Sequence, residues 1–469
     1  MNTTQKWSLL GGLAVFALML VAPAPAGMTP LAWHTAALVV LMAIFWMTEA
    51  LPLTVTALLP FVVLPFTGVM PADKVAAAYY SPILFLVLGG AFIALAIERT
   101  GLHRRFALAI LTRGGKSAGS LLMAFMIATA LISMIVSNTA TALIMMPIAV
   151  AVLRANQTPE GETGGLAGAL PMGIAFAASI GGLGTLVGSP TNAIAAGLIE
   201  KSVGYSIDFL TWAAYGLPIV LVGVPLCWLI LMRVQKVADG GFDAAAAHAS
   251  IGEAQAWTIA ERRLVPLILL VVIGWVASSY LASALPKGML EDGTIAILVS
   301  LFLFVVPDGT GRPLLTWKEA DRAPWGVIMM FGGGLALAAG ISASGLDDWL
   351  GEALKPLSSV HPVVVALVLV GIVIVVTEFA SNVATASGVM PVVGGLIAAT
   401  GADPALLAVS AAMASSWGFM LPSGTGPNAI GWATEHIALP RMLKSGFLLD
   451  VVGIPLIVGT VWIIGTILG

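Results

Sequence analysis

Apolar stretches long enough to cross a lipid bilayer recur from one end of this chain to the other. A transmembrane helix needs roughly 17–25 predominantly apolar residues, and segments such as 30–48, 208–234 and 445–468 meet that length. Only 9% of the 469 residues are charged and the mean hydropathy is +1.03, whereas about a quarter of a soluble domain is charged. The chain is therefore predicted to be an all-α membrane protein embedded in the lipid bilayer. Its small net charge of −3 argues against a nucleic-acid partner.

The expected helices are separated by short polar segments. Uninterrupted spans are expected at 8–26, 30–48, 51–70, 81–110, 208–234, 263–284, 291–306, 324–343 and 445–468. Four further stretches carry polar interruptions: 120–155 at 137–139, 167–200 at 188–192, 361–400 at 381–383 and 403–436 at 424–428. The stretch 8–26 could pass for a signal peptide, but many equivalent spans follow it, so a first transmembrane helix is the better interpretation.

The interruptions recur at a fixed distance along the chain. SNTATALIMMP at 137–147 matches SNVATASGVMP at 381–391, an offset of 244 residues, and GSPTNA at 188–193 matches GTGPNA at 424–429, an offset of 236. Such internal repeats are typical of transporters built from two related halves. We therefore divide the chain into residues 1–234, with the N-terminal helix and the first repeat, a cytoplasmic link at 235–261, and residues 262–469, which form the second repeat.

Positive charges indicate how the spans are oriented, because cytoplasmic loops carry an excess of Lys and Arg. We place the N-terminus in the cytoplasm and treat 120–155 and 361–400 as re-entrant hairpins. Of the 20 Lys and Arg, 16 then face the cytoplasm, and the 4 that face outside are Lys74, Lys201, Lys287 and Lys355. This predicts a multi-pass protein of the inner (plasma) membrane with about 11 crossings and its C-terminus outside. The first hairpin opens inward and the second outward, as in an inverted repeat.

The four interruptions are rich in Ser, Thr, Asn, Gly and Pro. Non-helical backbone at membrane depth is tolerated only where it is buried in protein or lines a cavity. Helix N-termini present free N–H groups that suit an anion, whereas Asn and carbonyl oxygens suit a hard cation such as Na⁺. No Lys or Arg lies at any interruption. We therefore expect neutral donors and bound Na⁺ to hold a small anion together, which couples its transport to the cation.

Other reactive side chains give weaker signals. Cys227 lies alone in an apolar run, and the five histidines have no metal-ligand spacing. Glu378, one turn before the second Ser-Asn pair, is expected to orient the hairpin backbone rather than to bind a proton. The spans contain no nucleophile–base pair, so an enzyme such as an intramembrane hydrolase is not expected. A channel is also disfavoured, since two hairpins that close one site leave no continuous pore.

Five segments resemble the divalent anion:sodium symporter family, whose members carry dicarboxylates, citrate or sulfate. They are WMTEALPLTVTALLP at 46–60, SNTATA at 137–142, GSPTNA at 188–193, TEFASN at 377–382 and GTGPNA at 424–429. The resemblance covers essentially the whole chain. It implies a scaffold domain and a transport domain that moves against it like an elevator, usually in a homodimer.

The resemblance also implies which residues form the site. The first sodium site would use Ser133, Ser137, Asn138 and Gly188, and the second would use Thr377, Ala380, Asn382 and Gly424. The substrate would contact Asn138, Thr139, Ser189, Ser381, Asn382, Val383, Thr425 and Gly426.

One position departs from the family pattern. Dicarboxylate-carrying members typically have Thr as the third residue of both Ser-Asn tips, whereas the second tip here has Val383, which lacks the hydroxyl donor. The resemblance implies sodium-coupled uptake of a small divalent anion, with a C4-dicarboxylate such as succinate, malate or fumarate favoured. A sodium-coupled sulfate transporter, a sodium-independent dicarboxylate exchanger and a citrate or arsenite carrier are the alternatives.

Overall fold

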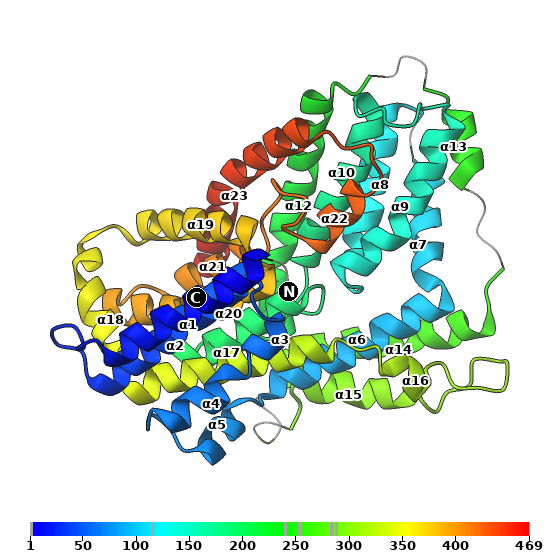
Figure 1. The fold of residues 1–469 in the computed structure, drawn as a ribbon. Coiled ribbons are helices and arrows are strands. Elements are labelled where there is room, and N and C mark those ends of the chain that lie inside the picture. The colour runs from blue at the N-terminus through cyan, green and yellow to red at the C-terminus, as the bar shows by residue number, and fades with distance from the viewer. Residues whose placement is uncertain are drawn as a thin grey trace.

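The computed structural model describes residues 3–114, 116–238, 242–251, 256–281, 286 and 289–468. Within these ranges the ordered elements are helices, with no β-strand beyond an isolated bridge between Pro307 and Pro313 (Figure 1). Nine of the described helices are at least 18 residues long and apolar enough to cross a membrane. The prediction of an all-α membrane protein is confirmed. The count of about 11 crossings stays a prediction, because several other apolar helices are shorter.

The first half comprises twelve helices in the described residues. They are α1 (Thr3–Val21), α2 (Pro30–Thr48), α3 (Leu53–Thr56), α4 (Leu59–Phe66), α5 (Ala72–Ala78), α6 (Pro82–Thr100), α7 (Leu102–Leu111), α8 (Ala118–Ser133), α9 (Asn138–Ala155), α10 (Gly165–Gly182), α11 (Pro190–Val203) and α12 (Phe209–Gln235). Three of them, α2, α6 and α11, begin at a proline. Proline is favoured there because the first N–H of a helix has no intrahelical acceptor.

The described part of the remaining chain begins with α13 (Ala244–Ile251), which lies in the segment between the halves. It continues with α14 (Ile259–Leu281), α15 (Asp292–Leu303), α16 (Trp317–Ala320), α17 (Trp325–Ser344), α18 (Leu346–Leu354), the 3₁₀ turn η1 (Lys355–Ser359), α19 (Pro362–Phe379), α20 (Asn382–Thr400), the π turn η2 (Ala405–Val409), α21 (Ser410–Ala414), α22 (Gly426–Trp432) and α23 (Leu439–Leu468).

The second half repeats the first in its helix boundaries. α8 and α19 begin 244 residues apart, as do α9 and α20, and α11 and α22 begin 236 residues apart. Gly101 and Gly345, also 244 apart, both follow a long helix in the left-handed conformation, with φ of 75° and 74°. Glycine adopts this conformation without a steric penalty, so it ends both helices at the same place in the repeat.

Two of the expected uninterrupted spans are wrong. Residues 51–70 form α3 and α4 instead of one helix, because Pro60 lies in the first turn of α4 and cannot donate the N–H that would continue α3. Together these helices are too short to cross a bilayer. Residues 81–110 are split at Gly101 into α6 and the amphipathic α7, which exposes Arg104 and buries Leu108.

The link predicted at 235–261 is partly helical, because α13 lies within it and packs against α7 and α9. Residues 239–241 and 252–255 of that link lie outside the described residues, as does Lys287, one of the four charges predicted to face outside. The helix predicted at 263–284 corresponds to α14, whose described part ends at Leu281.

The four interrupted stretches are confirmed, but each break lies before its polar motif or at its start. The non-helical residues are 134–137 before α9, 183–189 before α11, 380–381 before α20 and 415–425 before α22. The motif residues therefore form the N-caps and first turns of four helices. Ser, Thr and Pro favour those positions, whereas they disfavour the helix interior.

Helix α10 lies at the centre of one bundle, packed against α8, α9, α12 and α22 (Figure 1). It is buried from Ala167 to Gly182. Its small residues allow close approach, since a Cβ atom at Gly181 would lie 2.4 Å from the Cα of Ala130 on α8. α6 and α15 pack together along the lower edge of Figure 1. This arrangement holds the break before α11 beside the first hairpin.

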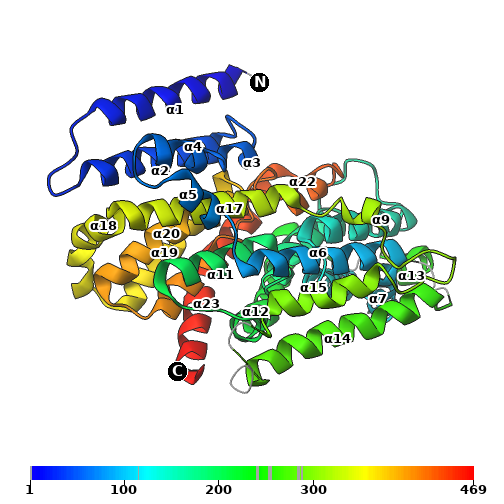
Figure 2. The same cartoon turned by 90° about the horizontal axis from the view of Figure 1, so that it is seen from below.

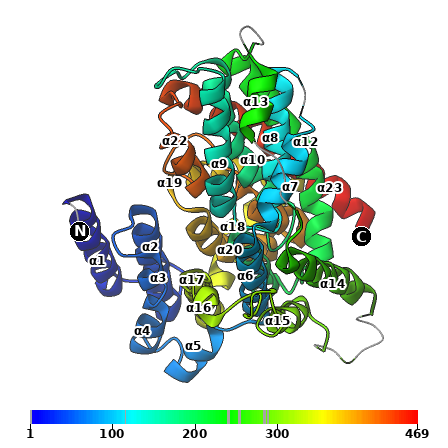
Figure 3. The same cartoon turned by 90° about the vertical axis from the view of Figure 1, so that its right-hand side faces the viewer.

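Helix α1 packs on α2 at the edge of the molecule (Figure 2). Gly12 is its one buried residue among those described, so most of its apolar side chains face outward, as expected for a helix surrounded by lipid. The N-terminus and the C-terminus lie on opposite sides of the molecule (Figure 3). α1 is thus separated from the polar breaks by α2 and α17.

Candidate anion and cation site

Four helices begin at a Ser or Thr whose side chain caps the helix. The side-chain oxygens of Ser137, Ser189, Ser381 and Thr425 accept the backbone N–H groups of Ala140 (3.4 Å), Thr191 (3.3 Å), Ala384 (3.2 Å) and Asn428 (3.2 Å). The other N–H groups of each first turn have no intrahelical acceptor, and they carry the positive end of the helix dipole. The sequence motifs therefore mark four N-termini at which an anion could be held.

Ser133, the last residue of α8, links the first hairpin to α10. Its hydroxyl donates to the carbonyl of Ala178 at 2.7 Å and lies 2.8 Å from the carboxamide of Asn138. A serine hydroxyl has one hydrogen, and Ser133 donates it to Ala178. The oxygen of Ser133 can then only accept from Asn138, so the amide presents its NH₂ group to Ser133. In that orientation Nδ2 also reaches the carbonyls of Ala178 and Gly188, each at 3.2 Å. Ser133, Asn138, Ala178 and Gly188 thus form an oxygen-lined cup, termed the first cup.

The first cup is built closely around two glycines. A Cβ atom at Gly182 would lie 2.2 Å from the side-chain amide of Asn138, and one at Gly188 would lie 2.5 Å from the carbonyl oxygen of Gly182 and 3.0 Å from that of Ser133. If the Asn138 amide turned over, its own oxygen would join the hydroxyl and carbonyl oxygens. Such a set of neutral oxygens fits a hard cation such as Na⁺.

Thr377 makes the matching contacts in the second half. Its hydroxyl donates to the carbonyl of Ser415 at 2.7 Å and lies 3.0 Å from Oδ1 of Asn382. A Cβ atom at Gly424 would lie 3.4 Å from the carbonyl of Leu421 and 3.5 Å from that of Glu378. Thr377, Asn382 and Ser415 form the second cup, whose oxygens also suit a hard cation. The predicted ligand Gly424 lies beside the carbonyls of Leu421 and Glu378, so its role stays a prediction.

Two of the predicted cation ligands have another role in the structure. Ser137 caps α9 with its side chain. Ala380 lies between Thr377 and Asn382 as the C-cap of α19, where its N–H donates to the carbonyl of Val376. Neither contact prevents the backbone carbonyl of these residues from facing a cation, so their role as ligands stays a prediction.

Sequence reasoning missed the carbonyls of Ala178 and Ser415, because a backbone oxygen leaves no mark on residue type. It also left out Asn192 and Asn428, although both lie in the recognised motifs. The Asn192 amide donates to the carbonyls of Gly182 (2.7 Å) and Thr185 (2.8 Å), and the Asn428 amide donates to that of Leu421 (3.0 Å). Each amide therefore ties a helix start to the non-helical segment before it.

Glu378 stabilises the break before α22. Its buried carboxylate accepts the backbone N–H groups of Phe419, Met420 and Leu421, the last two at 2.9 and 3.1 Å. The prediction that Glu378 orients the backbone of its own hairpin is wrong, because its carboxylate binds the backbone of residues 419–421 instead. Because three N–H groups share one carboxylate, the segment beside the second cup is held in a defined shape.

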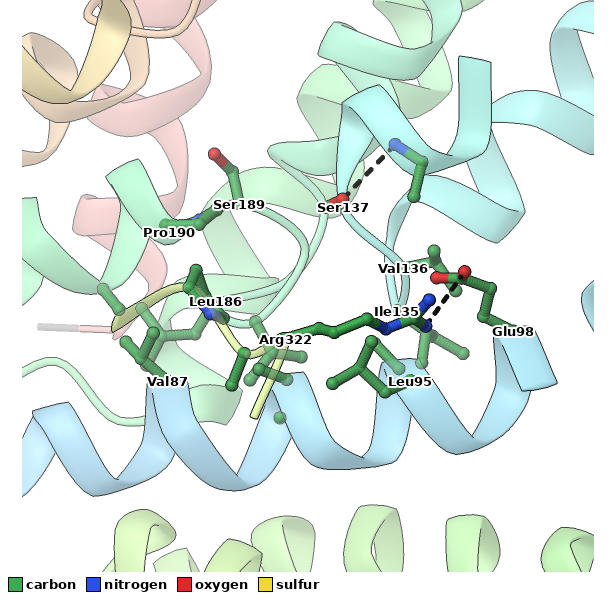
Figure 4. Close-up of a pocket in the computed structure, with 18 residues that line it drawn as sticks. Val87, Leu95, Glu98, Ile135, Val136, Ser137, Leu186, Ser189, Pro190 and Arg322 are labelled. Atoms are coloured by element: carbon green, nitrogen blue, oxygen red, sulfur yellow. Dashed lines mark hydrogen bonds and ion pairs between the residues drawn. The ribbon is translucent and has the colours of Figure 1, made fainter. Parts of the chain in front are cut away.

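The two halves interlock at the helix starts. α9 packs against α22, and α11 packs against α20, so each hairpin contacts a broken helix of the other half. Thr139 approaches Gly426 so closely that a Cβ atom at Gly426 would lie 2.3 Å from Oγ1 of Thr139. Ser137 and Ser189 line one cavity of about 260 Å³ (Figure 4). These contacts bring the N-termini of α9, α11 and α22 close to one another.

Val383 packs against apolar residues of two hydrophobic clusters, one of which includes Ala384 and Met330. It is the third residue of the second hairpin tip, where the first tip has the exposed Thr139. The two tips therefore present different chemistry to a ligand, as the sequence indicated.

A family model described as the sodium:sulfate symporter transmembrane region matches residues 3–469. The chain belongs to the sodium:sulfate symporter family. This membership confirms the resemblance drawn from the five sequence segments, and it identifies the chain as a multi-pass membrane transporter rather than an enzyme.

Curated members of the sodium:sulfate symporter family are similar over nearly the full chain. The sodium-dependent dicarboxylate transporter SdcS of Staphylococcus saprophyticus is 37% identical, and the match covers 98% of this chain and 91% of the relative. SdcS of Staphylococcus aureus (strain MRSA252) is 36% identical, with 99% and 92% covered. The crystal structure of the Alcanivorax borkumensis YdaH transporter matches with a TM-score of 0.55 at 16% identity, covering 98% of this chain and 97% of that one. That likeness shows the fold alone.

Proposed function

We propose that this chain is a sodium-coupled secondary transporter that takes up a small divalent anion, a C4-dicarboxylate such as succinate, malate or fumarate. The observation that carries the proposal is the pair of matching cups, in which Ser133 and Thr377 make equivalent contacts to Asn138 and Asn382. Relatives at 36% and 37% identity are named sodium-dependent dicarboxylate transporters, which favours a dicarboxylate over sulfate.

In this proposal the residues of the chain couple the two kinds of ligand. Na⁺ held in the cups would supply the positive charge that the tips lack. Asn138 and Asn382 reach the cups from the first turns of α9 and α20, so the orientation of their amides ties the shape of each tip to its cup. The substrate carboxylates then accept hydrogen bonds from the first-turn N–H groups and hydroxyls, of which Thr139, Ser189, Ser381 and Thr425 are the donors that we assign.

The larger arrangement is part of the same proposal. Residues 1–234 and 262–469 form inverted repeats, with the N-terminus cytoplasmic and the C-terminus outside. The four capped helices belong to a transport domain that moves like an elevator against a scaffold domain within a homodimer. The matching helix boundaries of the two halves support the repeat.

Uptake of labelled succinate into proteoliposomes tests the proposal. An inward sodium gradient should drive succinate above its external concentration, and replacing Na⁺ with K⁺ should abolish that accumulation. Uptake that is indifferent to Na⁺ but is accelerated by internal succinate would replace symport with exchange and contradict the proposal.

Competition experiments identify the anion. Unlabelled succinate should suppress the sodium-dependent signal at lower concentration than citrate or sulfate. The variant Val383→Thr adds a hydroxyl at the second tip, and the same competition panel shows whether this position changes the preference. Stronger suppression by sulfate than by succinate in the natural protein would assign the chain to sulfate.

A further inference from the structure

The cavity of about 260 Å³ beside the first hairpin is lined by charged side chains as well as by Ser137 and Ser189 (Figure 4). α6 forms one wall, and Ser137 and Ser189 lie on the opposite wall. The segment Arg322–Pro324, which leads into α17, contributes the remaining lining. The cavity therefore joins two residues of the proposed anion site to a basic residue from a different part of the chain.

The described residues that line this cavity include one of each charge, Arg322 and Glu98. Nη2 of Arg322 lies 3.3 Å from Oε1 of Glu98, and the two side chains are 58% and 40% exposed. Figure 4 shows the Arg322 side chain extended along the cavity toward Glu98, with Ser137 and Ser189 on the other side of the open space. The guanidinium thus faces the same volume as the two serines.

An exposed ion pair of this kind contributes little net free energy, because water and salt screen it. A carboxylate that enters the cavity can therefore take the place of Glu98 at small cost. Arg is suited to that exchange, since its planar guanidinium offers five donors and binds a carboxylate in a bidentate manner.

We propose that Arg322 captures the anion at a subsite beside Ser137 and Ser189, exchanging Glu98 for a carboxylate of the substrate. This inference rests on the proposed function. Arg322 supplies a cation beside a site whose four breaks carry no Lys or Arg. In the predicted orientation Arg322 is cytoplasmic, so the subsite lies at the inner mouth of the pathway, where the anion is bound before release or after entry from inside.

Two variants separate capture of the anion from a structural role of the ion pair. Arg322→Gln and Glu98→Gln both break the pair, but only the first removes the cation. Lys318→Gln is the matched control, because Lys318 is an exposed cation four residues before Arg322 that does not line the cavity. Size-exclusion profiles and thermal unfolding in detergent establish that each variant is folded.

The measurement is the KM for labelled succinate taken up through the cytoplasmic face, in everted membrane vesicles. Arg322→Gln should raise KM by about 2- to 5-fold, the effect of losing one partly screened ion pair, while the maximal rate changes less. Arg322→Lys should restore part of the affinity, because Lys keeps the charge but not the bidentate geometry. Glu98→Gln should lower KM, since it frees the guanidinium, and Lys318→Gln should behave as the natural protein does.

The outcomes distinguish this inference from the proposed function. Equal increases of KM in Arg322→Gln and Glu98→Gln would show that only the ion pair matters and would overturn the capture role. An unchanged KM in Arg322→Gln would overturn it as well. In both cases sodium-dependent uptake by the natural protein would leave the proposed function standing, whereas its absence would refute that function itself.

Discussion

Ser133 and Thr377 make the same two contacts in the two halves of the chain. The Ser133 hydroxyl donates to the carbonyl of Ala178 on α10, and the Thr377 hydroxyl donates to that of Ser415, just after α21. Each hydroxyl also contacts the amide of an Asn five residues later in the chain. The residue type differs, but the hydroxyl oxygen is shared, because Ser and Thr place Oγ at the same position on the side chain. The two halves therefore share the hydroxyl and the amide, whereas the methyl group of Thr377 has no counterpart at Ser133.

Removal of either amide should abolish coupling to sodium. Asn138→Ala and Asn382→Ala each delete a ligand that also orients a hairpin tip, so we expect roughly a tenfold to hundredfold loss of sodium-driven succinate uptake, as for the loss of about 1.5–3 kcal/mol of binding. Na⁺ should raise the melting temperature of the natural protein relative to K⁺ by mass action, and the variants should lose that shift.

Asn156→Ala provides the control for these variants. Asn156 ends the same helix α9, and its side chain contacts Asp243 and Val152 rather than a cup. It should keep the sodium dependence of both uptake and melting. Near-normal uptake in Asn138→Ala and Asn382→Ala would refute the assignment of the cups.

Gly426 is the residue at which a side chain should disturb the contact between the halves most directly. A Cβ atom there would lie 2.3 Å from Oγ1 of Thr139, so Gly426→Ala must displace Thr139 or the start of α22. Gly388→Ala on α20 is the matched control, because a Cβ atom there meets nothing within 4 Å. We expect Gly426→Ala to lose most succinate uptake and Gly388→Ala to retain it; equal activity of the two would contradict the close contact.

At the scale of helices, the break before α22 is the longest irregular segment of the site. Residues 415–425 have few helical hydrogen bonds of their own, yet backbone N–H groups buried in a membrane protein need acceptors. Glu378 provides one for Phe419, Met420 and Leu421, and the Asn428 amide donates to the Leu421 carbonyl. One carboxylate on α19 thus shapes a segment that also borders the second cup.

Glu378→Gln should therefore weaken the second cup. The neutral amide replaces a charged acceptor and turns an NH₂ group toward backbone donors, so we expect a loss of stability of about 2 kcal/mol and a higher sodium concentration for half-maximal uptake. Melting curves and sodium titrations of uptake measure the two effects.

Asp450→Asn is the companion variant. Asp450 lies on α23, where its buried carboxyl group contacts Glu378 and the backbone of Phe419. Replacing it relieves a contact between two buried acidic groups, so stability should be kept or should rise. If Glu378→Gln and Asp450→Asn lowered the melting temperature equally, the specific role of Glu378 would be wrong.

At the scale of the whole molecule, the orientation in the membrane follows from charge and can be tested chemically. The native cysteine, Cys227, is buried at 1% exposure, so it should not react with a membrane-impermeant maleimide. Lys74, Lys116, Lys318 and Lys355 are exposed. Each can carry the only reactive cysteine of a variant.

In intact cells Lys74→Cys and Lys355→Cys should be labelled, whereas Lys116→Cys and Lys318→Cys should react only after the membrane is permeabilised. This pattern is expected because the positive-inside rule places the first two outside and the others in the cytoplasm. The reverse pattern would invert the assigned topology and with it the direction in which each hairpin opens.

Much of this architecture is visible in the sequence because the bilayer imposes strong local rules. Long apolar runs predicted most of the spans, and the offsets of 244 and 236 residues predicted matched interruptions at 381–383 and 424–428. The structure shows that helices α20 and α22 begin there, at Asn382 and Gly426. The two predicted spans that are wrong are each divided by a single residue. Pro60 divides the span at 51–70, and Gly101 divides the span at 81–110. Hydropathy does not register the break at Pro60, because that proline lies in an apolar run, whereas Gly101 lies between the charged residues Arg99 and Arg104.

The sequence by itself determined the membrane class, the two repeats and the polar breaks, since polar side chains at membrane depth are costly and therefore conspicuous. The family resemblance then implied Asn138, Asn382, Ser133 and Thr377 as candidate ligands. Only the tertiary structure decided which groups they meet. The carbonyls of Ala178 and Ser415, the contact of Thr139 with Gly426 and the position of Arg322 beside Ser137 all join segments far apart in the chain. Such contacts depend on how the helices pack against one another in three dimensions. The residue types at each position do not by themselves indicate which distant segments will meet.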